Sequence, residues 1–157
     1  MTLKEKINTD YIAAFKAKDT IGKSALSGLK SKILEAEKAG PAGTELSDAD
    51  VLSIVISTVK QRKQSVEEFT KAGRMDLVDQ EVLELEPIGS YLPKQMSDSE
   101  ITSSVIEIIA EFDRATLNIQ ALTGKAIGAF NKKFPGMASP VRVKEIISEN
   151  IIEKISN

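Results

Sequence analysis

The chain has 157 residues, 28% of them charged and 41% hydrophobic, and a formal net charge of -2 at pH 7. A chain of this length can bury a core without disulfides, as one domain or as two small ones. It contains no cysteine and no histidine, which excludes disulfides, thiolate nucleophiles, imidazole bases and the usual zinc ligands. Because the N-terminus is charged at once and no apolar run could span a bilayer, we expect a soluble, cytoplasmic protein.

The first part of the chain is predicted to be helical throughout. Apolar residues recur there at spacings of three or four in three successive segments, which is the period of an amphipathic helix, whereas no strand-like alternation competes. The residues of these three stripes are Leu3, Ile7, Tyr11 and Phe15; Leu26, Leu29, Ile33 and Ala36; and Leu52, Val55, Val59, Val66 and Phe69.

Capping and breaking residues separate these helices. Residues 40–43 (Gly-Pro-Ala-Gly) end the second helix, since glycine and proline disfavour its continuation. Ser47, with Asp50 three residues later, is placed to cap the third helix, and Gly73 is placed to close it.

A fourth helix is expected from about Met75. Pro87 and Gly89 should forbid its regular continuation, so residues 88–92 are expected to form a turn or a short helical piece. Residues 1–92 are therefore predicted to form a bundle of about four helices.

A second bundle is expected over residues 93–157. Pro93 breaks the preceding helix, and Ser97 with Glu100 forms the S-x-x-E pattern of a capping box. The first of its three helices should bury Ile101, Val105, Ile108, Ile109 and Phe112.

The other two helices of this bundle also have recognisable starts. One is predicted from about Asn118 to Lys133, and the last begins with Ser139 as cap and Pro140 at its first position. The last helix carries a wide apolar band that should be core: Val143, Ile146, Ile147, Ile151, Ile152 and Ile155. The fold class is therefore all-α, with an N-terminal bundle linked to a C-terminal three-helix bundle.

A basic stretch in the second bundle is the main candidate for function. Six basic residues and no acidic residue lie between positions 114 and 144: Arg114, Lys125, Lys132, Lys133, Arg142 and Lys144. Interleaved glycines would let a partner's backbone approach closely, and a polyanion is the natural partner. The alternative is an ordinary solvated face, paired with acidic residues of adjoining helices: Glu107, Glu111, Asp113 or Glu145.

The glycines of this stretch are open to two interpretations. Gly124 and Gly128 share one helix face, so they serve either close packing against a neighbouring helix or approach of a ligand; Gly136 lies in the following turn. Phe130 and Phe134 are the only aromatic residues among the basic ones. Stacking of single-stranded bases is therefore not expected, and a bound RNA would be folded and recognised by backbone and shape.

A second basic cluster, Lys60, Arg62 and Lys63, precedes Glu67 and Glu68 on one predicted helix. Intrahelical pairs such as Arg62 or Lys63 with Glu67 account for much of it. The alternative is a contact surface, completed by Arg74, for a protein partner or for RNA.

Several motifs together resemble the GatB/YqeY family, which comprises free-standing YqeY proteins and the C-terminal tail of the B subunit of glutamyl/aspartyl-tRNA amidotransferase. The resemblance covers nearly the whole chain. Five segments carry it: residues 60–65 (Lys-Gln-Arg-Lys-Gln-Ser), 73–78 (Gly-Arg-Met-Asp-Leu-Val), 91–93 (Tyr-Leu-Pro), 124–129 (Gly-Lys-Ala-Ile-Gly-Ala) and 136–140 (Gly-Met-Ala-Ser-Pro). Met137 departs from the family, which usually has a basic residue there, and Ser139 replaces its Asn or Asp.

The resemblance implies a tRNA-binding accessory module that acts beside an amidotransferase or another tRNA enzyme. Its C-terminal bundle would resemble the part that contacts the outer body of tRNA, through Lys125, Lys132, Lys133, Arg142 and Lys144. Because no amidase signature and no Walker-type phosphate loop is present, we expect no intrinsic catalysis, and no cofactor, metal or membrane partner. The alternative function is a helical adaptor between proteins with no direct RNA role.

Overall fold

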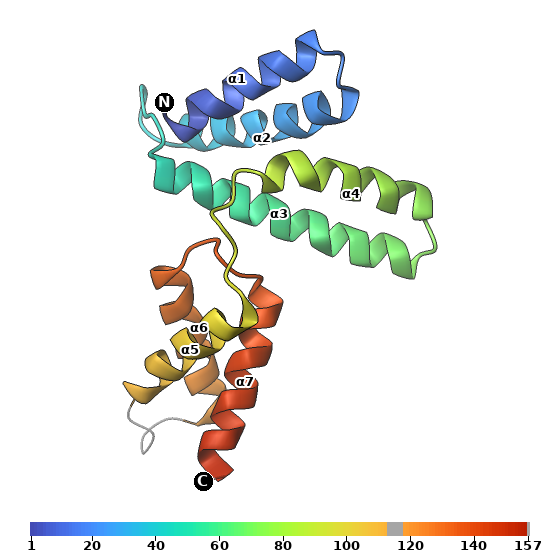
Figure 1. Ribbon diagram of the computed structural model, residues 1–157. Coiled ribbons are helices and arrows are strands. Elements are labelled where there is room, and N and C mark those ends of the chain that lie inside the picture. The colour runs from blue at the N-terminus through green and yellow to red at the C-terminus, as the bar shows by residue number, and fades with distance from the viewer. Residues whose placement is uncertain (113–117, 157) are drawn as a thin grey trace. The chain divides into compact units, whose positions relative to one another are not determined.

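The computed structural model describes residues 1–112 and 118–156, with side chains described as far as Ile151. Within these residues the chain forms seven α-helices and no strand (Figure 1), which confirms the all-α prediction. Arg114 and Asp113, and the side chains of Ile152 and Ile155, lie outside the described residues.

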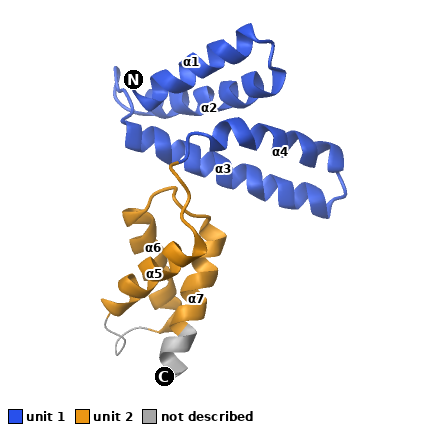
Figure 2. Cartoon of the chain, in the orientation of Figure 1, with its two compact units in different colours: residues 1–92 blue, residues 93–157 orange. Residues whose placement is uncertain are grey.

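The chain divides into two compact units, residues 1–92 and 93–157 (Figure 2). The first contains four helices: α1 (Leu3–Lys16), α2 (Thr20–Ala39), α3 (Asp48–Lys71) and α4 (Met75–Gly89). The second contains three: α5 (Asp98–Ala110), α6 (Ile119–Lys133) and α7 (Pro140–Ser156).

Two predicted capping boxes are confirmed. Ser47 Oγ accepts from the Asp50 N–H at 3.2 Å, while the Ser47 N–H donates to the Asp50 carboxylate at 3.2 Å. Ser97 and Glu100 make the same reciprocal pair at the start of α5, at 3.2 and 2.8 Å. Each box satisfies backbone donors that have no partner inside the helix, so both helices begin where the sequence predicts.

The predicted stop at Gly73 is also confirmed. Gly73 has φ +70°, a left-handed conformation that glycine adopts without a steric penalty. Its N–H donates to the Thr70 carbonyl at 3.1 Å, and the next N–H, of Arg74, donates to the Phe69 carbonyl at 2.9 Å. This pair of bonds is the Schellman motif, which ends α3 and turns the chain into α4.

The predicted end of α4 is wrong by two residues, because the expected turn is confined to residues 90–92. The helix continues through Pro87 to Gly89, although proline lacks the N–H that would complete the helical ladder. The continuation buries Ile88 completely, and this burial offsets part of the cost. The Ser90 hydroxyl also donates to the Pro87 carbonyl at 2.7 Å, which satisfies one of the free acceptors at this helix end.

The first core lies among all four helices of unit 1, since α2 packs on α1, α3 and α4. Its buried residues are Ile7, Ala25, Leu26, Leu29, Ile33, Val51, Val55, Val59, Ile88 and Tyr91. Phe15, predicted to be on the apolar stripe of α1, is instead 57% exposed. Each step of four residues turns the side chain by about 40° around the helix axis. A row of residues that faces the core at Ile7 therefore faces solvent at Phe15.

Tyr91, from the Tyr-Leu-Pro motif, holds the end of unit 1 to its beginning. Its ring is buried, and its hydroxyl donates to Asp10 Oδ2 on α1 at 2.6 Å. Burial and the neighbouring Asp10 carboxylate raise the pKa of Tyr91 above its ordinary value. This motif residue therefore has a structural role.

A buried charge pair ties α3 to α4. Arg62 Nη1 lies 2.6 Å from Glu84 Oε2 and 3.2 Å from Glu81 Oε2. The Glu84 side chain is only 7% exposed and also accepts hydrogen bonds from Ser24 on α2 and from Gln80, each at 3.1 Å. Because a charge buried without partners is strongly unfavourable, this network fixes the relative positions of α2, α3 and α4.

The second core belongs to unit 2, where α5, α6 and α7 pack on one another pairwise. Its buried residues are Ile101, Val105, Ile108, Ile109, Leu122, Ala126, Phe130, Val143, Ile146, Ile147 and Ile151. These include every predicted core residue of α5, and those of α7 whose side chains are described. Phe112, predicted within the first helix, follows its end at Ala110 and is half-buried against this core.

Glu84→Gln should destabilise unit 1 by about 3 kcal/mol, because it leaves the buried Arg62 guanidinium without its nearest counter-charge. Urea unfolding followed by circular dichroism measures this loss. Glu81→Gln, which leaves Glu84 in place, should cost less, and Glu86→Gln on the exposed side of α4 should cost almost nothing. Equal losses in all three variants would contradict the assigned role of Glu84.

Candidate functional site

Two lysines and two glycines share the exposed face of α6. Gly124, Lys125, Gly128 and Lys132 all lie on the solvent side, whereas Leu122, Ala126 and Phe130 point into the core. Lys125 and Lys132 are seven residues apart, which places them two turns, or about 10 Å, apart along one face. We call these four residues the α6 glycine–lysine face.

The glycines of this face are open to solvent. A methyl group added at Gly124 or at Gly128 would meet no atom of the described residues within 4 Å, the neighbouring backbone of α6 itself aside. The interpretation that they allow close packing of helices is therefore wrong. A spacing of four shows that two residues lie on the same side of a helix, but it does not show whether that side faces the core or the solvent. In α6 the small residue that faces the core is Ala126, which is 1% exposed.

Among the described residues of unit 2, the positive charges without an acidic partner are those of lysines. Lys125, Lys132, Lys133 and Lys144 are all exposed, and none makes an ion pair within 4 Å among the described residues. Lys125 Nζ lies 4.9 Å from the centre of the Phe112 ring, and Lys133 Nζ lies 5.5 Å from that of Phe134. These ring contacts orient the two amines without neutralising them.

Arg142 differs from these lysines because its side chain makes ion pairs with other residues of unit 2. Its guanidinium donates to both carboxylate oxygens of Asp98, at 3.1 and 2.9 Å, and to Glu145 at 2.9 Å. Hydrogen bonds from Arg142 lower the pKa of Asp98, and those same bonds to Asp98 and Glu145 raise the pKa of Arg142. Arg142 thus joins the N-terminal turns of α7 and α5, and its charge is already balanced.

The sequence predicts the pairing of Arg142 only in part. Glu145 is among the acidic residues expected to pair with the basic stretch, but Asp98 is not. Asp98 lies 44 positions away in sequence. Because it directly follows the helix cap, its negative charge is already explained by the favourable interaction with the N-terminal end of α5. The sequence carries no signal that α7 brings Arg142 to it.

Gly136 belongs to the turn between α6 and α7. Its φ of +71° is left-handed, and its carbonyl accepts from the Gln95 side-chain amide at 2.7 Å. The Met96 N–H donates to the neighbouring Met137 carbonyl at 2.7 Å. Gly136 therefore fixes the start of unit 2 against this turn.

The second basic cluster does not form one surface. Lys60, Lys63 and Arg74 are exposed, but Arg62 points inward to Glu84, and its side chain is only 19% exposed. The predicted intrahelical pairing of Arg62 with Glu67 is therefore wrong. Arg74 in turn pairs with Asp76 in the first turn of α4, at 3.1 Å.

Metal-binding groups and membrane-spanning helices are both absent from the described part of the chain. No three acidic side chains gather there in a way that could hold a metal ion. None of its helices is both long enough and apolar enough to cross a membrane. The α6 glycine–lysine face, flanked in sequence by Lys133 and Lys144, remains the strongest candidate site, and its chemistry suits an anionic partner.

Comparison with known proteins identifies a family and several relatives. A family model described as Yqey-like protein matches residues 4–151. "Altered inheritance of mitochondria protein 41, mitochondrial" of Lachancea thermotolerans is 31% identical over 120 residues, which cover 75% of this chain and 62% of the relative. The protein with the same name from Kluyveromyces lactis is 28% identical over 148 residues, or 90% of this chain and 78% of the relative.

An uncharacterized protein of Schizosaccharomyces pombe is also similar, with 34% identity over 77 residues, which cover 48% of this chain and 63% of the relative. The matched region thus spans somewhat less than two thirds of the Lachancea and Schizosaccharomyces relatives.

The expectation of a cytoplasmic protein is wrong. Two of these relatives are named as mitochondrial proteins, which points to mitochondria rather than to the cytoplasm. The expectation rested on a charged N-terminus and on the lack of a long apolar run. Those features do not distinguish one aqueous compartment from another.

Arg142→Met should lower the free energy of unfolding of unit 2 at pH values above 4. At pH values below 4 the substitution should have a much smaller effect. The pKa of Asp98 is held below its ordinary value of 3.8 in the folded protein, so its stabilising contribution is present above that value and is lost as pH falls through the lowered pKa. Thermal unfolding of both proteins between pH 2.5 and 7 measures the difference. A difference in melting temperature that stays constant over this range would contradict the pairing, and Val141→Met at the neighbouring exposed position is the control.

Proposed function

This chain belongs to the YqeY-like protein family, and from that premise we propose that it is a non-catalytic module that binds folded tRNA through the α6 glycine–lysine face. The proposal rests on one observation: two exposed glycines with open space above them share a helix face with Lys125 and Lys132. A phosphate backbone can approach such a helix closely enough for both amines to reach it.

The chemistry of the face favours structured RNA over single strands. It carries no aromatic side chain, since Phe130 is buried in the core and Phe134 is half-buried beside it. Binding of single-stranded RNA depends largely on stacking of bases on aromatic rings. Lysines without such rings suit a folded RNA, which is read by its backbone and shape.

Transfer RNA is proposed on the strength of the resemblance of the C-terminal part to the amidotransferase tail. Residues 124–129 carry that resemblance and include three of the four residues of the face. We further propose that the protein partner is a glutamine-dependent tRNA amidotransferase, a carbon–nitrogen ligase, or another tRNA enzyme. In that setting the module would supply RNA contacts and the partner would supply the chemistry.

Arg142 takes no part in the proposed RNA contact. Its guanidinium already has two carboxylate partners, so a phosphate would have to displace them. The proposed RNA-binding residues are accordingly Lys125 and Lys132, with Lys133 and Lys144 as flanking charges.

A protein–protein adaptor is the second candidate. It is favoured by the apolar side chains that α4 exposes in unit 1, where Val82 and Leu83 are about half exposed. Docking of a partner helix on such residues would depend little on salt, whereas RNA binding through lysines weakens steeply as salt rises. The salt response of binding therefore separates the two functions.

The double variant Lys125→Gln, Lys132→Gln should weaken binding of folded bulk tRNA and reduce the slope of log affinity against log salt by about two, because two phosphates would no longer be neutralised. Filter binding or fluorescence anisotropy at salt concentrations from about 50 to about 300 mM measures both quantities. Lys38→Gln, Lys71→Gln is the matched control, because it removes two exposed lysines from unit 1 that belong to neither basic cluster. Unchanged affinity in the first variant would exclude this face as the RNA site.

Gly128→Gln should make the protein more stable and yet a weaker RNA binder. Replacing a glycine inside a helix stabilises it by about 0.5 kcal/mol, and the open space at Gly128 accommodates the new side chain. The same side chain would hold the RNA backbone away from Lys125 and Lys132, so tRNA affinity should fall several-fold.

Gly128→Ala, which adds only one methyl group, should reduce affinity less than Gly128→Gln. Urea unfolding and tRNA titration of the two variants provide the comparison. A stabilised Gly128→Gln protein with full affinity would show that the glycines are not needed for RNA approach.

A further inference from the structure

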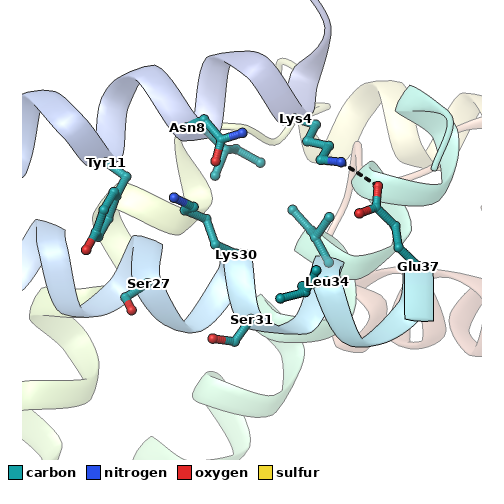
Figure 3. Close-up of a pocket in the computed structure, with 10 residues that line it drawn as sticks. Lys4, Asn8, Tyr11, Ser27, Lys30, Ser31, Leu34 and Glu37 are labelled. Carbon is teal, nitrogen blue, oxygen red and sulfur yellow. Dashed lines mark hydrogen bonds and ion pairs between the residues drawn. The ribbon is translucent and has the colours of Figure 1, made fainter. Parts of the chain in front are cut away.

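A pocket of about 330 Å³ lies between α1 and α2 in unit 1 (Figure 3). Ile7 and Ile33 lie behind its wall and are nearly fully buried, so Leu34, with 49% of its surface exposed, supplies the accessible apolar surface. Polar side chains from both helices complete the wall. Its volume is at the lower end of the range for small-molecule sites, so a ligand would be small.

One end of the pocket is closed by a satisfied ion pair. Lys4 Nζ lies 2.6 Å from Glu37 Oε1, which also accepts from the Leu46 N–H at 3.3 Å. The hydrogen bond from Lys4 lowers the pKa of Glu37, so its carboxylate is charged at neutral pH. Lys4 and Glu37 therefore balance one another and add no net charge to this end of the pocket.

Lys30 brings a positive charge that has no such balance. Its Nζ lies 4.2 Å from the centre of the Tyr11 ring, and it has no carboxylate within 4 Å among the described residues. The Tyr11 ring holds the amine in place by a cation–π contact. The pocket lining thus carries one uncompensated positive charge.

Asn8 offers hydrogen-bond donors beside this amine. Lys30 extends from α2 toward Asn8 on α1 (Figure 3), and both residues line the pocket. The Asn8 side chain makes no hydrogen bond within the described structure. An ammonium and a free amide that converge on one space are suited to the two oxygens of a carboxylate.

We propose that this pocket binds a small organic acid, with its carboxylate between Lys30 and Asn8 and its short apolar part against Leu34. A carboxylate carries a single negative charge, which matches the single uncompensated amine. A phosphate group carries nearly two at neutral pH, which is more than this one amine balances. This site lies in unit 1 and does not depend on the proposed RNA contact of unit 2.

The test is an NMR titration of the full chain with three probes at constant ionic strength: 4-methylpentanoate, acetate and inorganic phosphate. The first should shift the Asn8 side-chain amide and the Tyr11 ring signals along a saturating curve. Acetate should bind about tenfold more weakly, because it lacks the two or more CH₂ groups that the pocket would bury. Phosphate should bind no better than acetate.

Lys30→Met removes the amine, keeps an unbranched apolar stem, and should abolish saturation by 4-methylpentanoate. Lys38→Met, at an exposed position of the same helix away from the pocket, should leave it unchanged. A well-dispersed spectrum of each variant would show that it is folded. The proposal is overturned if the wild type shows no saturating shift, if the shift survives Lys30→Met, or if phosphate binds as tightly as 4-methylpentanoate.

Discussion

The ion pair of Arg62 with Glu84 is the interaction on which unit 1 depends most. It places opposite charges 2.6 Å apart on two long helices, in surroundings where the Glu84 side chain is nearly inaccessible to water. Arg142 makes a corresponding but more exposed connection with Asp98 in unit 2. In both units an arginine joins helices: Arg62 contacts two carboxylates through Nη1, and Arg142 binds both oxygens of Asp98 with the fork of its guanidinium.

This use of arginine determines which charges remain for a partner. The three arginines that the structure describes, Arg62, Arg74 and Arg142, all have carboxylate partners. The free positive charge of unit 2 is therefore carried by lysines, on flexible stems that can follow a phosphate backbone without a fixed geometry. Sequence-independent recognition of a folded RNA is consistent with such an arrangement.

Local signals in the sequence predicted much of the fold, because helix caps act over three or four residues. Ser47, Ser97 and Gly73 mark helix ends that the structure confirms. Contacts between distant segments could not be predicted: one partner of Arg142 lies 44 positions away, and Arg62 pairs with a residue of the next helix instead of one on its own. The orientation of Gly124 and Gly128 could not be predicted either, since their spacing fits an inner and an outer face equally well.

The most direct test of the central claim is to titrate ¹⁵N-labelled protein with folded bulk tRNA and follow its backbone amide signals, with double-stranded DNA of matched charge as control. The account predicts that the signals of Gly124 and Gly128, with those of Lys125 and Lys132, shift or broaden first, and that tRNA affects them at lower concentration than DNA does. Changes confined to α3 and α4, or equal and weak effects of tRNA and DNA, would contradict an RNA site on α6.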